Sequence, residues 1–329
     1  MFFSIIIPLY NRPEELDELL ASLTAQTDKR FEVIIAEDGS TKKSDAVVEK
    51  YRDKLSLTYF GKANSGPGLS RNEGAARASY DYLIFFDSDC IIPPTYIENV
   101  SLYLRNHYVD AFGGPDAALP SFTTVQKAIN YAMTSFFTTG GIRGGKKSLE
   151  RFNPRSFNLG VSGAAFKELG GYGTMRFGED IDFSLRLLQK GFSTALIPEA
   201  YVYHKRRSTF KQFFRQVYNS GIARINLHLA HPGSLRLVHA LPALFVVTMT
   251  MSCILSPVYP LLLSIPAGYS LILFIDSLGK NRSLKVALYS IVAAWVQLSG
   301  YGTGFLSAAW KRLVLKQGVF KAFEKKFYD

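Results

Sequence analysis

Two aspartates follow an apolar segment and are separated by a single serine. Asp87 and Asp89 come directly after residues 82–86, which are apolar at every position. A continuous apolar run is typical of a strand that is buried on both faces of a parallel sheet. Carboxylates after such a strand lie where open α/β sheets bind ligands, and divalent cations prefer their oxygens. Because an Asp-x-Asp triplet alone is more often a solvated turn, its function depends on its neighbours.

Two other predicted strands also end in polar residues. The first, at residues 3–8, leads through Pro8 and Tyr10 to Asn11, and the second, at residues 31–36, ends in an acidic turn. The carboxyl ends of neighbouring parallel strands meet at one edge of a sheet. We therefore expect the three strand ends to form a donor site with a nucleotide lying across them.

The acidic turn and a later helix supply groups that suit a nucleotide. A carboxylate can accept from a pyrimidine imide N–H or a ribose hydroxyl, so Asp38 is predicted to contact the base. Arg71 follows the glycine-rich turn 64–68 and offers a forked set of donors to phosphate or ribose. The dinucleotide-fold fingerprint and the P-loop pattern are absent, which disfavours a Rossmann dehydrogenase, a P-loop NTPase and a sugar-nucleotide pyrophosphorylase.

A second acidic cluster lies at the start of a predicted helix. Glu179 and Asp180 fall in its first turn, where acids often only complement the helix dipole. The glycine turn at residues 170–173 and the neighbouring acids indicate a pocket, so Asp180 is predicted to be a general base. Asp182 and Arg186 have the i,i+4 spacing of an ion pair that supports the helix, and we assign them that structural role.

A histidine follows the apolar stretch 200–203. By itself His204 is more often structural or solvated. Beside a cation held by Asp89 it becomes a metal ligand or a phosphate contact.

The elements that must position these residues alternate between strand and helix. This order predicts an α/β fold with a doubly wound, mostly parallel sheet and right-handed crossovers. The strands are expected at residues 3–8, 31–36, 55–60 and 82–86, and the helices at 13–27, 44–51 and 69–78.

Taken together, the motifs resemble those of the family 2 glycosyltransferases, which have a GT-A-type fold. The resemblance covers roughly residues 3–221 and depends on blocks that occur in the family's order. These are Ile-Pro-Leu-Tyr-Asn at 7–11, Glu-Asp-Gly-Ser-Thr at 37–41, Ser-Arg-Asn-Glu-Gly at 70–74, Phe-Asp-Ser-Asp at 86–89, Gly-Glu-Asp-Ile-Asp-Phe-Ser-Leu-Arg at 178–186 and Val-Tyr-His at 202–204.

The resemblance implies an inverting transfer from a nucleotide sugar, by default a UDP-sugar. It implies that Asp38 contacts the base, that Asp87 contacts the ribose and that Asp89 holds Mg²⁺ or Mn²⁺ on the diphosphate. Asp180 would be the catalytic base. Glu37 stands where the family usually has the first aspartate of Asp-Asp-Gly-Ser.

One family motif is missing. Processive members hold their polymer with a Gln-x-x-Arg-Trp box, but both tryptophans here, Trp295 and Trp310, lie in the last apolar segment. We therefore expect one sugar to be added per encounter. Residues 213–218 occupy a similar place, and Arg215, like Glu179, is predicted to contact the diphosphate or the acceptor.

Two long segments near the C-terminus carry no formal charge. Residues 237–275 and 286–310 each exceed the roughly 20 residues that cross a bilayer as a helix. The first is long enough for a hairpin of two spans, and the second would be a third span. Two spans, or a re-entrant first segment, would keep a basic tail in the cytosol, which the positive-inside tendency favours.

We expect a catalytic domain at residues 1–235, transmembrane segments at 236–310 and a basic tail at 311–329. An interfacial helix is predicted at about 208–230, within a basic stretch that suits an anionic membrane better than nucleic acid. The N-terminus reads as a strand rather than a signal peptide, which places the catalytic domain on the cytosolic face of the inner membrane. Only two cysteines are present, so neither a disulfide framework nor a zinc site is indicated.

The acceptor is predicted to be membrane-associated, possibly polyprenyl-linked, and to serve cell-surface polysaccharide synthesis. An enzyme of the dolichyl-phosphate-mannose-synthase type is an alternative, because its phosphate acceptor needs no base. A non-catalytic membrane scaffold is a further alternative, which the presence of all four aspartates, Asp38, Asp87, Asp89 and Asp180, disfavours.

Overall fold

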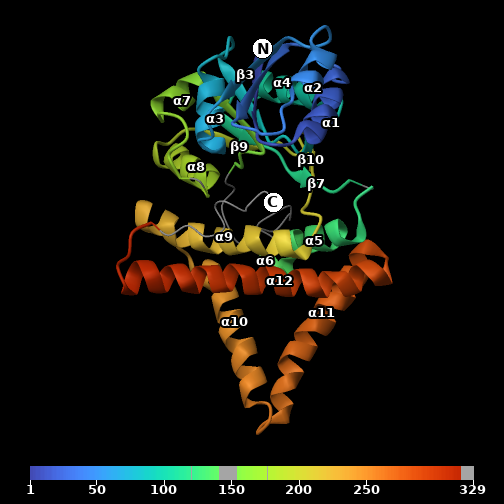
Figure 1. Cartoon of the computed structure of the whole chain (residues 1–329), viewed down its shortest axis with the longest axis vertical. Coiled ribbons are helices and arrows are strands. Elements are labelled where there is room, and N and C mark those ends of the chain that lie inside the picture. The colour runs from blue at the N-terminus through green and yellow to red at the C-terminus, as the bar shows by residue number, and fades with distance from the viewer. Residues whose placement is uncertain (120, 141–153, 176, 320–329) are drawn as a thin grey trace. The chain divides into compact units, whose positions relative to one another are not determined.

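The chain forms two compact units. The computed structural model describes residues 1–119, 121–140, 154–175 and 177–319 (Figure 1). The first unit comprises residues 1–119 and 152–205, and the second comprises residues 120–151 and 206–329. We call them the α/β unit and the helical unit. This division cuts across the predicted domain 1–235, because three helices within that range pack with the C-terminal helices. Residues 320–329 of the predicted basic tail lie outside the described residues.

The α/β unit contains a mixed sheet of seven strands in the order β3-β2-β1-β4-β8-β6-β9. Neighbouring strands are parallel except that β8 is antiparallel to both β4 and β6. The sequence predicts the four parallel strands β1 to β4, whereas β6, β8 and β9 were not predicted. The strands are β1 Phe3–Leu9, β2 Phe31–Asp38, β3 Leu57–Lys62, β4 Tyr82–Phe86, β6 Ala111–Gly113, β8 Asn158–Ser162 and β9 Thr194–Leu196.

Helices cover both faces of this sheet, which is why its central strands are apolar at nearly every position. In β1, Ile5 and Ile7 pack in the same core cluster as residues of α1, α2 and α4, and Ile6 packs in another cluster with residues of α7 and α8. All three isoleucines are fully buried. The helices are α1 Pro13–Thr24, α2 Asp45–Tyr51, α3 Pro67–Ala75, α4 Tyr96–Asn106, α7 Gly163–Glu168 and α8 Glu179–Gln189.

The predicted helix boundaries differ from the observed ones by up to three residues. Helix α3 begins at Pro67 rather than at residue 69, because proline is well accommodated at the first helical position. It ends at Ala75, three residues before the predicted end. Strand β2 runs on to Asp38, so the acidic turn begins inside the strand.

A second, three-stranded sheet has the order β5-β10-β7. Its strands are β5 Cys90–Ile91, β7 Asp116–Ala117 and β10 Val202–His204. Strand β10 runs antiparallel to β5, with His204 opposite Cys90. This pairing brings His204 beside Asp89, although 114 positions of the sequence lie between them.

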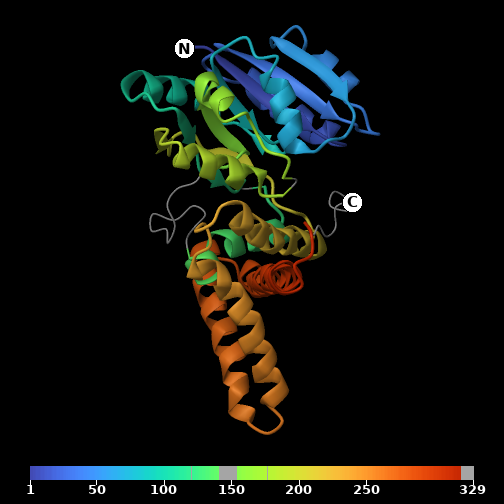
Figure 2. The ribbon, with the colours of Figure 1, turned by 90° about the vertical axis from the view of Figure 1, so that its left-hand side faces the viewer.

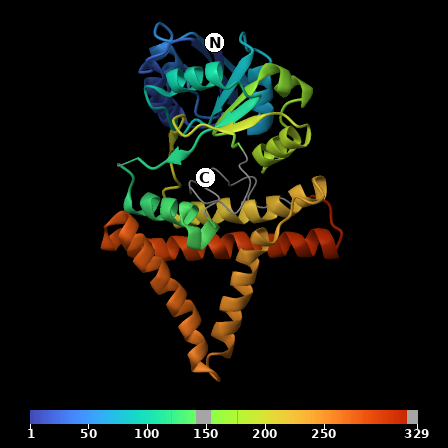
Figure 3. The same ribbon diagram turned by 180° about the vertical axis from the view of Figure 1, so that it is seen from behind.

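The helical unit is built from two pairs of long helices and two shorter helices (Figures 1 and 3). Helix α9 lies along α12, and α10 and α11 leave from α12 and converge at a tight turn. The predicted interfacial helix corresponds to α9. The helices are α5 Thr124–Thr134, α6 Phe136–Thr139, α9 Phe210–Ala230, α10 Leu237–Leu255, α11 Ser264–Asn281 and α12 Leu284–Ala309, with a 3-10 turn η1 at Pro260–Leu263 and a π turn η2 at Trp310–Val314.

Helices α9 and α12 approach each other closely at glycines. A Cβ atom built on Gly304 would lie 2.2 Å from the carbonyl oxygen of Tyr218, and one on Gly221 would lie 2.2 Å from that of Tyr301. Gly302 faces α10 in the same way, 2.3 Å from the carbonyl oxygen of Pro242. Small residues at such spacing let helix backbones come into contact.

Two helices of the described chain are long and apolar enough to cross a membrane, Leu237–Leu255 and Pro260–Asn281. Only 22% and 11% of their apolar windows are buried in the protein, so they are not core helices of the helical unit. The third apolar segment forms α12, which does not meet the same criteria and packs against α9.

Candidate active site

The ends of β2, β1 and β4 are adjacent in the sheet, as the sequence predicts. In the parallel register Leu9 lies opposite Glu37, and Ile6 lies opposite Phe85. The residues after these three strands therefore share one edge. Pro8 and Tyr10 are partly exposed at that edge.

Asp38 holds the glycine-rich turn that follows β3. Its Oδ1 accepts from the Ser65 N–H at 2.8 Å and from Lys62 Nζ at 3.0 Å, and its Oδ2 accepts from the Gly66 N–H at 2.8 Å. Asp38 is 4% exposed. A carboxylate has about four lone-pair sites, so capacity remains for a ligand N–H or O–H. The predicted contact with a base stays a prediction, and the contacts in the structure assign Asp38 to shaping the turn.

Asn11 joins the loops after β1 and β2. Its Oδ1 accepts from the N–H groups of Thr41 at 2.7 Å and Lys42 at 3.0 Å, and its own N–H donates to Ser40 Oγ at 2.9 Å. Its φ of 53° is in the left-handed region, which asparagine tolerates better than most residues do. Asn11 therefore holds the loop after β1 against the loop after β2 through these hydrogen bonds.

Glu37, the departure from the family pattern, is fully buried. It accepts a hydrogen bond from the Tyr59 hydroxyl and lies 3.8 Å from Lys43 Nζ. Its side chain is therefore held within the sheet, and Asp38 is the acid of this block that reaches the glycine-rich turn.

Arg71 connects two parts of the predicted site. It is 2% exposed, and its Nη2 donates to Asp87 Oδ1 at 2.6 Å while its Nη1 donates to Glu179 Oε1 at 3.2 Å. The guanidinium also lies 5.3 Å from the ring centroid of Tyr172. Because arginine stays charged in a buried site, it fixes the two carboxylates relative to each other. The sequence predicted a ligand contact for Arg71, whereas the structure shows this bridge.

Glu179 and Asp180 are adjacent at the start of α8 and differ in pKa. Burial, together with the negative charge of Asp180, raises the pKa of Glu179 to about 7, and the charge of Arg71 opposes this rise. Burial would also raise the pKa of Asp180, but the charge and hydrogen bond of Arg155 outweigh it and hold the pKa below its usual value. Arg155 Nη1 lies 3.2 Å from Asp180 Oδ2. A carboxylate pair with separated pKa values is typical of acid–base sites.

The structural role expected for Asp182 and Arg186 is confirmed. Arg186 Nη2 lies 2.9 Å from Asp182 Oδ2 within α8. The same guanidinium donates to the carbonyl oxygens of Leu169 at 2.7 Å and Gly171 at 2.9 Å. The pair therefore fixes the glycine turn before the helix.

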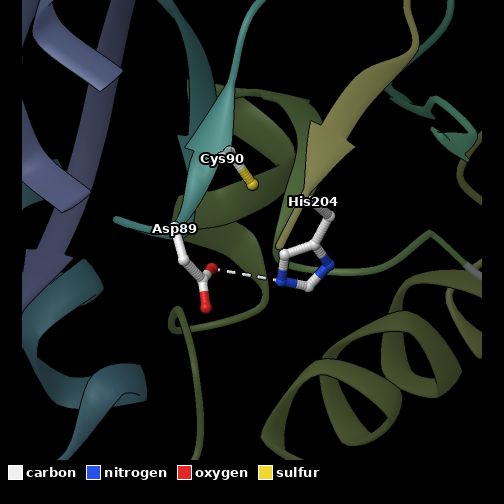
Figure 4. A group of neighbouring side chains, drawn as sticks. All are labelled: Asp89, Cys90 and His204. Atoms are coloured by element: carbon white, nitrogen blue, oxygen red, sulfur yellow. Dashed lines mark ion pairs between the residues drawn. The ribbon is translucent and has the colours of Figure 1, made fainter. Parts of the chain in front are cut away.

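Asp89 and His204 face each other across the small sheet (Figure 4). His204 Nε2 lies 3.1 Å from Asp89 Oδ1, and the imidazole stacks on Phe157 with the ring centroids 4.8 Å apart. On the other side, Arg12 Nη1 lies 2.7 Å from Asp89 Oδ2. The carboxylate is thus held between a cation and an imidazole.

These residues fit a divalent cation. One ligand atom each from Asp89, Cys90 and His204 lies within 4.8 Å of the others. The Cys90 thiol is buried and donates to the Phe157 carbonyl oxygen at 3.6 Å. Because burial and the charges of Asp89 and Asp87 raise its pKa well above the usual range, Cys90 is a poor ligand. An oxygen and an imidazole nitrogen remain, a donor set that suits Mn²⁺ or Mg²⁺ better than it suits thiolate-preferring metals.

Sequence reasoning missed three cations of the site. Arg12 pairs with Asp89, Lys62 with Asp38 and Arg155 with Asp180. Arg12 and Lys62 stand at or just beyond the carboxyl ends of predicted strands, a position that could have revealed them. Arg215 lies on α9 in the helical unit, and its predicted contact with diphosphate or acceptor stays a prediction.

Comparisons with known proteins agree with these motifs. The profile described as "Glycosyl transferase family 2" matches residues 4–166. An uncharacterized glycosyltransferase of Haemophilus influenzae is 33% identical over 217 residues, which cover 63% of this chain and 70% of that protein. The poly(ribitol-phosphate) beta-N-acetylglucosaminyltransferase TarS of Staphylococcus aureus is 35% identical over 114 residues, 33% of this chain and 20% of that protein. The match with TarS thus spans only a fifth of that relative's length.

Two solved structures share the fold. The S. aureus TarS 1–349 fragment in complex with UDP-GlcNAc has a TM-score of 0.50 and 20% identity, with 93% of this chain and 91% of that chain covered. The mannosyltransferase PcManGT from Pyrobaculum calidifontis, in complex with GDP-Man and Mn²⁺, has a TM-score of 0.56 and 15% identity, with 96% and 88% covered. At these identities the likeness concerns the fold alone, a GT-A-like mixed sheet followed by C-terminal helices.

Proposed function

This chain belongs to glycosyltransferase family 2, and from that premise we propose that it moves one sugar from a nucleoside-diphosphate sugar to a hydroxyl of a membrane-held acceptor, with inversion. The observation that carries the proposal is the chain of contacts Asp87–Arg71–Glu179, with Asp180 next along the helix. The buried guanidinium of Arg71 fixes Asp87, the proposed ribose contact, relative to Glu179. Such preorganisation is what group transfer requires of a protein.

The donor is proposed to lie along the edge formed by β2, β1 and β4. Asp38 would contact the base, and Asp87, whose side chain is 33% exposed, would contact the ribose. Pro8, Tyr10 and Asn11 would border the nucleotide. A uridine nucleotide is our choice of base, by analogy with the UDP-GlcNAc bound to TarS.

Asp89 and His204 would hold Mg²⁺ or Mn²⁺. When bound, the cation would neutralise the charge that develops on the leaving diphosphate. A relative of the same fold binds Mn²⁺ together with its nucleotide sugar, which supports this choice. Two protein ligands would suit Mg²⁺, which is usually held by few protein groups together with substrate phosphates and water.

Asp180 is proposed to be the general base. Its lowered pKa keeps it ionised at neutral pH, so it can accept the acceptor's proton as that oxygen forms a bond to the anomeric carbon. The bond between the anomeric carbon and the diphosphate oxygen breaks, and the electron pair leaves with the nucleoside diphosphate. Arg155 would keep the Asp180 carboxylate oriented.

The helical unit is proposed to attach the enzyme to the cytosolic face of the inner membrane. Helices α10 and α11 are apolar and mostly exposed, as expected for helices surrounded by lipid. A polyprenyl-linked or other lipid-held acceptor would then be in the same membrane as the enzyme. Cell-surface polysaccharide synthesis is the process we propose for it.

The test is transfer by the full-length chain in detergent, with a panel of nucleotide sugars and Mn²⁺ or Mg²⁺. We expect metal-dependent nucleotide release with one donor class, and we expect Asp180→Asn to lower kcat by about 10²–10⁴-fold with donor binding intact. The exposed acid Asp53 supplies a matched control, because Asp53→Asn should leave kcat unchanged. Near-wild-type transfer by Asp180→Asn would contradict the proposed base.

Transfer to a polyprenyl phosphate is the second candidate. The basic residues Lys211, Arg215 and Arg224 on α9 favour an anionic acceptor. A phosphate oxygen needs no deprotonation at neutral pH, so this reaction would tolerate Asp180→Asn. Transfer to a polyprenyl phosphate by that variant would therefore favour this candidate over the first.

A further inference from the structure

We propose that α12 lies in the membrane interface, parallel to the bilayer plane, and that only the α10–α11 hairpin enters the hydrocarbon. This inference builds on the membrane attachment proposed above. It assigns lipid as the occupant of one face of α12, although the sequence of that helix could equally pass for a third span.

The first argument comes from the partner of α12. Helix α9 runs beside α12 along most of its length: the rings of Phe210 and Tyr289 lie 6.1 Å apart near the start of both helices. Near the other end, Ile225 packs in the same cluster as Phe305 and Ala308. Between them, a Cβ atom on Gly304 would lie 2.2 Å from the carbonyl oxygen of Tyr218. The two helices therefore share one depth in any membrane.

Helix α9 is too polar for the hydrocarbon. It carries Lys211, Arg215 and Arg224, and its Asn219 is 2% exposed with no hydrogen bond to the amide in the described chain. Charged and unsatisfied polar groups are costly in lipid. If α12 crossed the bilayer, α9 would be carried into the hydrocarbon beside it.

Charges also lie beside the first half of α12. Ser290 Oγ of α12 accepts a hydrogen bond from Ser277 Oγ of α11 at 2.8 Å. Next to Ser277, Asp276 pairs with Lys280 at 2.8 Å and accepts from the Tyr131 hydroxyl of α5 at 2.7 Å. The C-terminal end of α11 therefore lies among charged and polar side chains beside α12.

Exposed apolar side chains lie towards both ends of α12. They are Leu284, Leu288 and Val292 near its start and Leu306 near its end, followed by Trp310 and Leu313 in η2. We call this set the α12 stripe. Tyr289 and Trp310 stand near the two ends of the helix, and such aromatic residues prefer the membrane–water interface. A helix with one apolar face and a polar partner is typical of an interfacial position.

The α10–α11 hairpin leaves α12 on the side that faces away from α9. The position of the hairpin indicates that lipid covers the α12 stripe. Figures 1 and 2 show α10 and α11 leaving from α12 in that direction, and Figure 2 shows α12 almost end-on. Exposed apolar residues continue along the hairpin, among them Leu244, Ile254, Leu271 and Ile275. Surface that continues from lipid-facing helices onto the α12 stripe fits the same lipid.

The proposed orientation predicts that the hairpin turn and the α12 stripe lie at different depths in the bilayer. Helix α10 has 19 residues and spans about 28 Å, close to the hydrocarbon thickness of ~30 Å. The hairpin turn near Val258 would approach the opposite leaflet, whereas the α12 stripe would lie at one shallow depth. Residues before α10 and after α12 would lie on the same side of the membrane.

The experiment measures depth with a fluorophore on single cysteines in the full-length chain. Cys253 is replaced by serine and the buried Cys90 is kept, since it is shielded from labelling. Cysteines are then placed at Val292, Leu306 and Leu271, with exposed Leu102 of α4 as the control. The proteins are reconstituted in phosphatidylcholine–phosphatidylglycerol vesicles containing lipids brominated at shallow or deep positions.

We expect equal, shallow quenching at residues 292 and 306, deep quenching at 271 and none at 102. Residues 292 and 306 lie about 21 Å apart along the helix axis, so a spanning α12 would give them clearly different depths and overturn the proposal. Quenching at 271 without quenching at 292 and 306 would also overturn it, because protein would then cover the stripe. An absence of quenching at all four positions would instead refute the membrane attachment on which the proposal rests.

Discussion

The two carboxylates at the start of α8 have pKa values shifted in opposite directions, and this difference motivates our proposal that Asp180 is the base. Asp180 is held ionised by Arg155, whereas Glu179 has a pKa of about 7. A base acts when deprotonated, so kcat/KM rises with pH through the pKa of the free enzyme's base. If Asp180 is the base, its ionisation should not change kcat/KM between roughly pH 6 and 8, because its lowered pKa lies below that range. That range is centred on the pKa of Glu179, about 7.

The control for this pH profile is Glu179→Gln. If the wild type shows a rise centred near pH 7 that Glu179→Gln abolishes together with most of the activity, Glu179 is the base and our assignment is wrong. If Glu179→Gln keeps a flat profile with a raised KM, Glu179 positions Arg71 and the donor instead. The measurement is kcat/KM for nucleotide release at constant metal concentration.

Arg12 would compete with the proposed cation for Asp89, because it pairs with that carboxylate in the structure. Its guanidinium is 2.7 Å from Asp89 Oδ2, and both side chains are only partly exposed, 18% and 15%. Removing one charge of such a pair changes the binding energy by about 1 kcal/mol, which corresponds to roughly a fivefold change in affinity. We expect Arg12→Ala to bind Mn²⁺ about fivefold more tightly without nucleotide, as measured by the paramagnetic resonance of free Mn²⁺.

His204→Ala supplies the opposite control, because it removes a proposed ligand and should weaken Mn²⁺ binding. Weaker binding by Arg12→Ala as well would mean that Arg12 supports the cation site rather than competing with it. A change in neither variant would place the cation away from Asp89.

At the scale of elements, the packing of α9 on α12 depends on glycines. A methyl group at Gly304 would lie 2.2 Å from a backbone oxygen of α9, so one helix must move. Overpacking of this kind costs about 1–3 kcal/mol. We expect Gly304→Ala to lower the thermal unfolding temperature of the helical unit in detergent and to leave nucleotide binding by the α/β unit intact.

Gly268→Ala is the matched control within the same unit. Nothing lies within 4 Å of a Cβ atom at Gly268, and the residue is inside α11. Alanine is the better helix former by about 1 kcal/mol, so this variant should be unchanged or slightly stabilised. Equal loss of stability in both variants would mean that backbone contact at Gly304 is not the cause.

The sequence predicts elements well where the pattern is long and apolar on both faces, as in β1, β2 and β4. It misses β8, since residues 158–162 include Asn158 and Gly160 and lack such a pattern. A Cβ atom on Gly160 would lie 1.9 Å from the Phe112 ring, so tertiary packing determines this strand. The site follows the same rule: the aspartates after strands could be predicted, but the arginines that pair with them depend on contacts between distant loops.

The third predicted span was ambiguous for a related reason. Residues 286–310 are uncharged, and an uncharged segment can face either lipid or another helix. The glycines at 300 and 304 lie against α9 in the structure, which a sequence count of apolar residues does not weigh. Small residues at a helix–helix contact therefore give a reason, beyond hydropathy, to assign this segment to packing against α9.

At the scale of the whole molecule, the proposed catalytic residues and the two long apolar helices belong to different units. All the proposed donor and metal contacts lie within residues 1–205, and the exposed apolar helices lie within residues 237–281. This separation predicts that membrane binding can be weakened without loss of catalysis on soluble substrates. Leu271, 57% exposed in the middle of α11, is the position for such a test.

We expect Leu271→Lys to weaken binding of the full-length chain to vesicles, because a lysine in the hydrocarbon costs about 2.5–3.5 kcal/mol. That cost corresponds to a loss of roughly 10²-fold in partitioning, measured by flotation, and transfer to a lipid-held acceptor should fall with it. Nucleotide release in detergent should stay at the wild-type rate. Leu102→Lys on α4, which is also exposed, should change neither quantity. If Leu271→Lys floated like the wild type, α11 would not lie in lipid. Another surface of the helical unit would then have to account for membrane attachment.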